Sequence, residues 1–507
     1  MPAPHPDAIA DCVLAAFKAL PAKCKPRTLA DGRREWVPLA GIVLSRDSPS
    51  PQSAHLRPTI GTPATDISAP GRLDPTSPRT PPSPPHVPVA AETVLTCAAL
   101  ATGSKCLPCA KLPLAKGNVL HDWHAEVLAI RGFNRWLVDE CRELARMGRE
   151  GKGEGERRWV RWRTDAERRR GGEDTRAERD VEERRTAFAT GVSNSEAEEE
   201  GQEEEDKAND WQAQPFALAD NISLHLYVSD APCGDASMEL TMAAQPDATP
   251  WPITSFSSPS SSDTPDMPGR GHFSLLGVVR RKPGRADAPV TLSKSCSDKL
   301  SSKQCTSLLG GVASSLVHPE GMYLRSVIVP EGRYVKGAVE RAFGVGGRMA
   351  GLVGREWKGG YGFTPFEVRG TGRVFEYGKP ATVADGEGKE KDEVVGSNLS
   401  ALWTRSGKLE VLINGVLQGR KQFDTKGASC VSRRRVWESV REVLTAVDEA
   451  GVCDQEALRL VQGCRTYEDL KASRPLQPRE RVKRDVKNLA LRGWTRNLGD
   501  ADWGLSD

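Results

Sequence analysis

Four segments of biased composition interrupt this chain and limit what the rest of it can fold into. Residues 45–88 and 246–271 are rich in Pro and Ser, residues 148–214 carry mixed and then acidic charge runs, and residues 380–396 are short, Gly-rich and charged. Segments of this kind cannot bury enough apolar surface to form a core. We therefore expect a single domain over residues 1–507 that carries these four segments as disordered or flexible insertions.

Between the insertions, the hydrophobic pattern switches between the periods of strands and helices. Residues 222–228 alternate apolar and polar side chains, as a half-buried strand does, and residues 126–147 lack Pro and space their apolar side chains at helical intervals. We expect further strands at 36–44, 91–101 and 322–329, and further helices at 11–20 and 431–447. Strands that alternate with helices predict a layered α/β core.

Composition excludes some classes of protein. The chain lacks an apolar run long enough to span a membrane and a secretory signal pattern, so we expect it to be intracellular, in the cytoplasm or the nucleus. Its 12 Cys are irregularly spaced, which favours buried thiols or metal ligands over a disulfide framework. A formal net charge of only +3 does not indicate a partner.

The residues that suit hydrolytic chemistry lie at the expected ends of helices and strands. His124 and Glu126 begin the expected helix, and Cys233 follows Pro232 just after the strand 222–228. A zinc ion with three protein ligands keeps its fourth position for water, and a carboxylate two residues from a ligating His can carry that water's proton. Zinc deaminases show H-x-E followed by P-C-x-x-C, but residue 236 here is Ala, so we expect Cys296 to supply the second thiolate.

Four motifs in one order carry a family resemblance. They occupy residues 98–106 (AALATGSKC), 121–126 (HDWHAE), 232–235 (PCGD) and 295–299 (SCSDK). This order resembles the adenosine deaminase domain that is shared by the deaminases acting on double-stranded RNA and the tRNA-specific adenosine deaminases.

The resemblance implies a fold and a set of roles. The fold is a deaminase-like mixed sheet with helices on both faces, and the reaction converts adenosine to inosine. One zinc ion would be bound by His124, Cys233 and Cys296, and Glu126 would be the proton shuttle.

The substrate is expected to be tRNA. No separate RNA-binding module is visible, and the chain begins almost directly in the deaminase pieces, which favours the tRNA-specific branch. The basic run that contains Arg281, Lys282 and Arg285 resembles that branch and predicts contacts to RNA phosphates, although such a run can also be a solvated loop. The resemblance implies the adenosine immediately 3′ of the anticodon of alanine tRNA. The alternatives are editing of structured or double-stranded RNA, and a non-catalytic RNA-binding protein with a structural zinc.

The related enzymes that act on double-stranded RNA bury inositol hexakisphosphate, and this chain has matching cationic and aromatic residues. They are Lys105, Arg131, Lys299, Arg433, Tyr467, Lys471 and Trp494, with Lys303 and Lys483 or Lys487 as looser candidates. A buried polyanion needs many cationic donors. The pattern departs from the family at Ile130 and Gln477, and the alternative is a solvated basic C-terminal helix.

One further cysteine pair has the spacing of a metal or redox motif. Cys106 and Cys109 form the only C-x-x-C in the chain. Because a second pair at matching spacing is missing, a four-cysteine zinc site is not expected here. His121, three residues before His124, is a possible ligand by residue type, but the family motif does not use it.

Overall fold

The computed structural model describes residues 3–47, 93–148, 158–168, 214–244, 269, 275–282, 288–380, 394–451 and 455–506. Most of the four expected insertions lie outside these ranges, as does Arg285.

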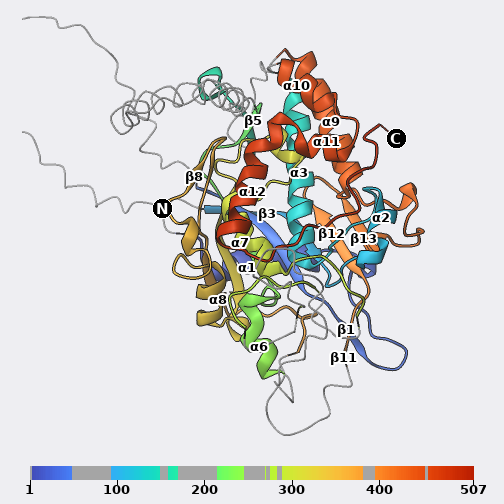
Figure 1. Cartoon of the computed structure of the whole chain (residues 1–507). Coiled ribbons are helices and arrows are strands. Elements are labelled where there is room, and N and C mark those ends of the chain that lie inside the picture. The colour runs from blue at the N-terminus through green and yellow to red at the C-terminus, as the bar shows by residue number, and fades with distance from the viewer. Residues whose placement is uncertain are drawn as a thin grey trace, which may run out of the picture.

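An eight-stranded mixed sheet forms the centre of the molecule (Figure 1). Its strand order is β10-β7-β6-β2-β3-β12-β13-β14. β10, β7 and β6 run parallel to one another, and each later pair is antiparallel. The strands are β2 (Leu39–Asp47), β3 (Thr93–Thr102), β6 (Ile222–Val228), β7 (Leu324–Pro330), β10 (Glu367–Thr371), β12 (Ser400–Thr404), β13 (Leu409–Ile413) and β14 (Val416–Leu417).

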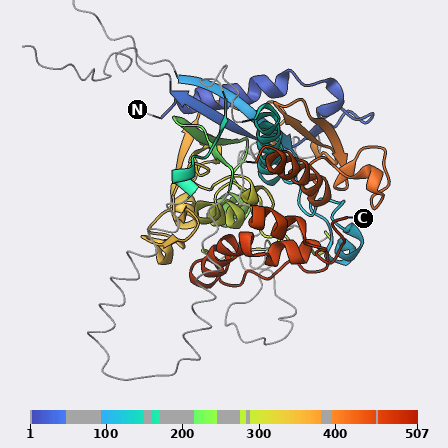
Figure 2. The same ribbon diagram turned by 90° about the horizontal axis from the view of Figure 1, so that it is seen from above.

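Helices cover both faces of this sheet. Figure 2 shows α1 (Pro6–Lys18) on one side of the strands and α3 (Ala125–Met147) on the other. Side chains of β3 alternate between the two layers: Ala99 and Ala101 join the hydrophobic core under α3, whereas Leu100 joins the core under α1. A strand that is buried on both faces needs a continuous apolar run, and residues 97–101 of β3 supply it. The expected α/β class, with helices on both faces, is confirmed.

The remaining elements surround this core. α9 (Arg433–Glu449) packs on α3, and α12 (Gln477–Leu489) and α8 (Lys336–Phe343) pack on α7 (Cys296–Thr306). Short helices are α2 (Leu112–Ala115), α6 (Met238–Ala243), α10 (Gln455–Gln462) and α11 (Tyr467–Ala472). Three small strand pairs are β1 (Arg34–Trp36) with β11 (Val394–Gly396), β4 (Val160–Trp162) with β5 (Phe216–Leu218), and β8 (Glu356–Trp357) with β9 (Tyr361–Gly362). Within the described ranges, no helix combines the length and the apolar character that a membrane span requires.

The expected strand at 222–228 forms, but it is not half-buried. Leu224 and Leu226 belong to the hydrophobic core under α3 and Tyr227 to the core under α1, so both faces of this strand are covered. His225, on the face expected to meet solvent, is fully buried. Its ring nitrogens lie 2.9 Å from the Ser45 Oγ and 2.8 Å from the Ser326 Oγ, so polar partners in the two neighbouring strands satisfy it.

At two places, residues that were expected to belong to an insertion form strands. Residues 45–47 are the end of β2, and residues 160–162 are β4, which pairs with β5. The rings of Trp162 and Phe216, which are opposite each other in the β4–β5 pair, have centres 4.6 Å apart. Phe216 also belongs to the main hydrophobic core, and its backbone N–H donates to the Leu316 carbonyl oxygen at 3.1 Å, which attaches the small sheet to the rest of the molecule. The composition around these residues is that of a linker, and the pairing that orders them comes from distant strands.

The close approach of α1 to the sheet depends on Gly41 in β2. A Cβ at this position would lie 2.5 Å from the Val13 Cγ1 of α1. We expect Gly41→Ala to lower the free energy of unfolding by about 1–3 kcal/mol, because the core is already filled. Denaturant unfolding followed by tryptophan fluorescence measures this loss.

Gly311→Ala is the matched control, since a Cβ there meets nothing within 4 Å. Adding Val13→Ala to Gly41→Ala should restore part of the lost stability. Equal stability of the Gly41→Ala and Gly311→Ala proteins would contradict the steric argument.

Candidate metal centre and active site

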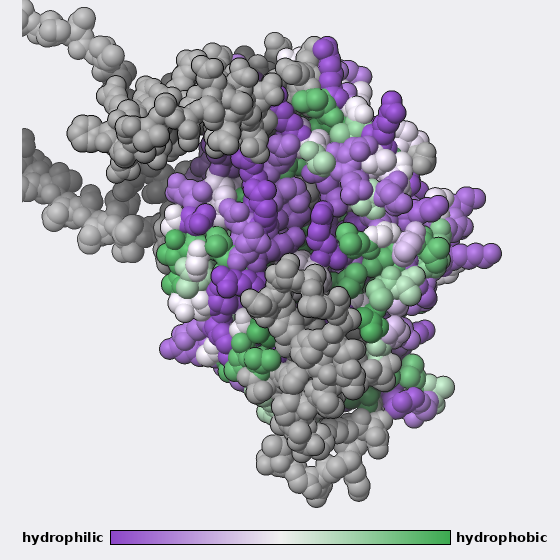
Figure 3. Space-filling view, viewed as in Figure 1, coloured by the Kyte–Doolittle hydropathy of each residue, from purple (hydrophilic) through white to green (hydrophobic). Residues whose placement is uncertain are grey.

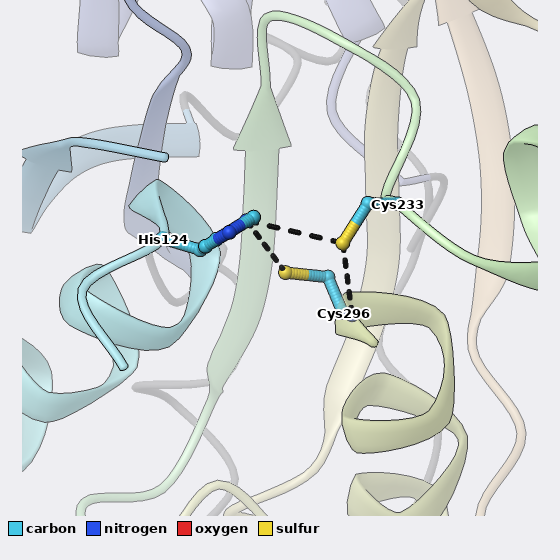
Figure 4. Close-up of side chains that lie close together, drawn as sticks. All are labelled: His124, Cys233 and Cys296. Atoms are coloured by element: carbon cyan, nitrogen blue, oxygen red, sulfur yellow. Dashed lines mark hydrogen bonds between the residues drawn. The ribbon is translucent and has the colours of Figure 1, made fainter. Parts of the chain in front are cut away.

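Three separate elements bring one imidazole and two thiols together. His124 precedes α3, Cys233 lies in the loop after β6, and Cys296 is the first residue of α7. Figure 4 shows the three side chains pointing toward one another. The His124 Nδ1 lies 3.8 Å from the Cys233 Sγ and 3.8 Å from the Cys296 Sγ, and the three donor atoms lie within 4.8 Å of one another.

This donor set fits a tetrahedral zinc ion. With Zn–S bonds of about 2.3 Å, neighbouring donors of a tetrahedron lie about 3.5–3.8 Å apart. A hydrogen bond from Cys296, the positive charge of Lys282 and that of His124 hold the pKa of the Cys233 thiol well below its usual range, against the effect of burial. The Cys233 sulfur also accepts the backbone N–H of Cys296 at 3.3 Å. A thiolate is the form that binds metal.

The SCSDK segment builds the start of α7 and attaches it to the Cys233 loop. Ser295 caps the helix, since its Oγ accepts the backbone N–H of Asp298 at 3.1 Å. The Ser297 hydroxyl lies 3.0 Å from the carbonyl oxygens of both Pro232 and Cys233. These hydrogen bonds join the Cys233 loop to the start of α7, and they therefore fix the positions of the two thiols relative to each other.

Two further residues of this region explain its tight packing. The Asp298 carboxylate binds the Arg348 guanidinium at 2.6 Å and the backbone N–H of Arg280 at 3.0 Å. Gly234, directly after Cys233, has φ +102°, and a Cβ there would lie 2.3 Å from the Ser295 Oγ. Only glycine allows the loop to turn this close to α7.

Asp122 joins the metal ligands to a buried ion network. Its Oδ1 accepts the backbone N–H of His124 at 3.0 Å, and its Oδ2 accepts the Lys282 amine at 2.8 Å and the Ser293 hydroxyl at 2.7 Å. Lys299 also donates to Oδ2. The Lys282 amine in turn donates to the Cys296 sulfur at 3.1 Å.

The location of Lys282 contradicts its expected role as an RNA contact. Its side chain is only 3% exposed, because its amine turns inward to the Asp122 carboxylate and the Cys296 sulfur. Arg281 is half-buried, and Arg285 lies outside the described residues. A run of basic residues does not reveal which of its side chains turns inward.

Glu126 lies in the first turn of α3, two residues beyond His124, and is buried. Burial raises the pKa of its carboxyl, and the nearby Cys233 thiolate raises it further. A carboxyl group with a raised pKa exchanges protons more readily near neutral pH.

Comparison with known proteins identifies the family. The model of the adenosine-deaminase (editase) domain matches residues 99–165 and 192–498. The chain belongs to this family. It is therefore a hydrolytic deaminase enzyme.

Curated relatives in the editase family agree with this assignment. The chain is 31% identical to the tRNA-specific adenosine deaminase 1 of Schizosaccharomyces pombe over 84% of this chain and 82% of the relative. It is 25% identical to the protein of that name from Saccharomyces cerevisiae, over 63% of this chain and 56% of the relative. The Mus musculus protein of that name is 26% identical, over 45% and 44%.

A second group of charges in this editase domain consists of buried cations. Lys303 and Arg479 both donate to the Leu309 carbonyl oxygen at 2.8 Å. Burial lowers the pKa of Lys303 well below its usual range, and the neighbouring charges of Arg479, Lys483 and Arg131 lower it further. Burial and Arg479 lower the pKa of Lys483 to about 8, although Glu480 opposes this. Arg479 was not identified from the sequence, because a single Arg in a basic helix carries no distinguishing signal.

Most of the expected inositol phosphate residues lie around these cations. The Arg433 guanidinium lies 5.6 Å and the Lys471 amine 5.5 Å from the centre of the Tyr467 ring. Trp494 packs beside α12, where Lys487 approaches its ring at 6.0 Å. Lys299 instead donates to Asp122, as described above.

Lys105 stands apart from these residues. It is exposed, and its amine donates to Asn398 in the loop before β12.

His121 is not a metal ligand in this arrangement. Its Nε2 lies 2.6 Å from the Asp500 Oδ2, and Arg433 approaches the same ring. Burial and the charge of Arg433 lower the pKa of His121 to about 4, so the ring is neutral at pH 7. Asp500 also accepts the backbone N–H of Gly117 at 2.7 Å, which fastens the C-terminal segment to the region before the metal site.

The network around Asp122 predicts a strong effect of removing Lys282. We expect Lys282→Met to destabilise the protein by about 3–5 kcal/mol, because the substitution leaves a buried carboxylate with one cation fewer. Chemical denaturation with metal analysis measures the loss. Lys299→Met should cost less, since the Lys299 side chain is 25% exposed and water can replace it. Equal or reversed effects would contradict this account.

Proposed function

We propose that the chain converts adenosine in tRNA to inosine and ammonia by hydrolysis, at the centre formed by His124, Cys233 and Cys296. The observation that carries this proposal is the convergence of these three donors beside the buried carboxyl group of Glu126. Membership of the editase family and the names of the curated relatives support the reaction and the RNA class.

The donor set supports zinc as the resident metal. His124 would bind through Nδ1, and Cys233 and Cys296 through their sulfurs, in the charge-balanced, mixed nitrogen and sulfur environment that zinc prefers. When bound, zinc would act as a Lewis acid and would lower the pKa of a water at its open position to about 7. The Lys282 amine, 3.1 Å from the Cys296 sulfur, would reduce the negative charge of that ligand.

Glu126 would move the protons of the reaction. Its carboxylate would accept a proton from the attacking water and deliver it to the departing amine at C6 of adenine, so that ammonia leaves and the carboxylate is regenerated. The raised pKa of Glu126 suits both halves of this transfer.

The substrate would present its adenine unstacked. The C6 amine of a paired base is not accessible to a buried centre, so the base must be flipped out or already lie in a loop. We propose the adenosine immediately 3′ of the anticodon of alanine tRNA, which the resemblance of the basic run at residues 280–285 to the tRNA-specific branch supports.

We also propose that inositol hexakisphosphate fills the space between the buried cations. Lys303 and Arg479 share one carbonyl oxygen, and the Arg479 Nε, which is buried, has no hydrogen-bond partner among the described residues. Such a concentration of positive charge is costly unless an anion accompanies it. Arg131, Arg433, Tyr467 and Lys471 would complete the site. In Figure 3, hydrophilic side chains cover the outer side of α12, whereas Arg479 is buried on the inner side of this helix together with Val482 and Val486.

Replacing the carboxyl group of Glu126 tests the mechanism. We expect Glu126→Gln to lower the rate of inosine formation by at least about 10²–10⁴-fold, because the amide cannot carry a proton. Zinc content, measured by inductively coupled plasma analysis, should not change. Glu143→Gln, at an exposed position of the same helix, is the control and should keep full activity. Inosine formation at the normal rate by Glu126→Gln would refute the role.

The same assay separates the possible substrates. Alanine tRNA transcripts, tRNA with the 3′-flanking adenosine replaced by guanosine, and long duplex RNA are incubated with the wild-type protein. Inosine in the first RNA alone supports the proposal. Inosine mainly in the duplex would indicate editing of double-stranded RNA, and none in any RNA would indicate a protein without this activity.

Arg479 offers a test of the polyanion. We expect Arg479→Met to weaken retention of inositol hexakisphosphate about 10- to 100-fold, since a charge-assisted hydrogen bond contributes about 1.5–3 kcal/mol. The measurement is phosphorus per chain after dialysis, together with the midpoint of thermal unfolding. Arg484→Met, on the exposed side of the same helix, should change neither. Purified wild-type protein without phosphorus would refute the proposed ligand.

A further inference from the structure

The C-x-x-C motif at residues 106–109 does not form a pair in the structure. Cys106 lies opposite Asp122 in a short antiparallel bridge. The backbone N–H of Leu107 donates to the His121 carbonyl oxygen at 2.9 Å, and that of Trp123 donates to the Lys105 carbonyl oxygen at 3.0 Å. Cys109 belongs to the next turn, where its N–H bonds the Val290 carbonyl oxygen. The backbone pairing therefore fixes Cys106, and not Cys109, beside the metal ligands.

His124 is shared between two groups of possible ligands. One group is His124, Cys233 and Cys296, and the other is His124, Asp122 and Cys106, whose donor atoms also lie within 4.8 Å of one another. The Cys106 Sγ lies within 4.8 Å of a ring nitrogen of His124. Among the described residues, Cys106 is not grouped with Cys233 and Cys296. A fourth ligand of a tetrahedral ion would have to lie close to all three of the other donors, so the arrangement does not make Cys106 a ligand.

Asp122 is engaged elsewhere. Its Oδ1 accepts the His124 backbone N–H, and its Oδ2 accepts donors from Lys282, Ser293 and Lys299. Within the second group, Cys106 is therefore the residue whose side chain lies beside the imidazole ring of His124.

We propose that Cys106 is a positioning residue of the metal centre, whose sulfur holds the His124 ring in the orientation that directs Nδ1 toward the Cys233 and Cys296 sulfurs. This inference rests on the proposed ligand set. Groups that hydrogen-bond a ligating histidine fix the orientation of its ring, and their loss reduces metal affinity about 10- to 100-fold. An ordinary role as a small buried hydrophobe would not have this effect, since alanine could replace the thiol there.

Cobalt(II) substitution of the full-length protein tests the proposal. Wild-type protein should bind one Co²⁺ per chain and show sulfur-to-cobalt charge-transfer absorption from two thiolates. In Cys106→Ala, the intensity of this absorption at saturating Co²⁺ should stay unchanged, while the Co²⁺ and Zn²⁺ affinities measured by chelator competition fall about 10- to 100-fold. Cys106→Ser, which retains a polar partner, should recover part of the affinity. Cys109→Ala is the matched control and should behave as wild type.

Each other result has a distinct meaning. If Cys106→Ala loses about a third of the charge-transfer intensity, Cys106 is a third thiolate ligand and the positioning role is wrong. Unchanged Co²⁺ and Zn²⁺ affinity in both Cys106→Ala and Cys106→Ser also overturns the positioning role. Circular dichroism identifies a variant that has failed to fold. Wild-type protein that binds no Co²⁺ or Zn²⁺ would instead refute the proposed metal centre, and with it this inference.

Discussion

One buried carboxylate, that of Asp122, holds the centre of this molecule together. It accepts hydrogen bonds from the start of α3, from the segment of Lys282 and Ser293, and from Lys299 of α7. A charge in this position would be costly if it were alone, but two ammonium groups and two neutral donors compensate for it. Because those donors come from distant parts of the sequence, satisfying one carboxylate also fixes the positions of His124 and Cys296 relative to each other.

Those features of the site that depend on neighbouring residues could be predicted from the sequence. The H-x-E spacing follows from the first turn of a helix, and in SCSDK each residue has a role that its type suggests: a cap, a ligand, a bond to the neighbouring loop and two charges. The sequence could not show the direction of the side chains. Lys282 was assigned to a surface that contacts RNA, whereas burial makes it a partner of Asp122 and Cys296. Arg479 was missed because its position depends on how α12 docks on α7.

In the fold, too, features that depend on neighbouring residues could be predicted, whereas features that depend on distant residues could not. The helix at 126–147 and the strand at 222–228 were expected because their periods depend on neighbouring residues. That the strand is covered on both faces depends on the two hydrophobic cores that pack on opposite sides of the sheet, which no local pattern records. Residues 160–162 were expected to be part of an insertion for the same reason, since their partner strand lies more than fifty residues later in the chain.

The attachment of the C-terminal segment affects how the chain can be assembled during synthesis. Asp500 binds Gly117 and His121, and Trp503 stacks on Tyr467 with ring centres 5.0 Å apart. Asp500 lies 383 positions after Gly117, so a ribosome adds it long after residues 117–121 have been made. The nascent protein must therefore keep this part of its surface open until residue 500 has been added. A chain stalled before that residue would present the region that precedes α3 without the segment that covers it.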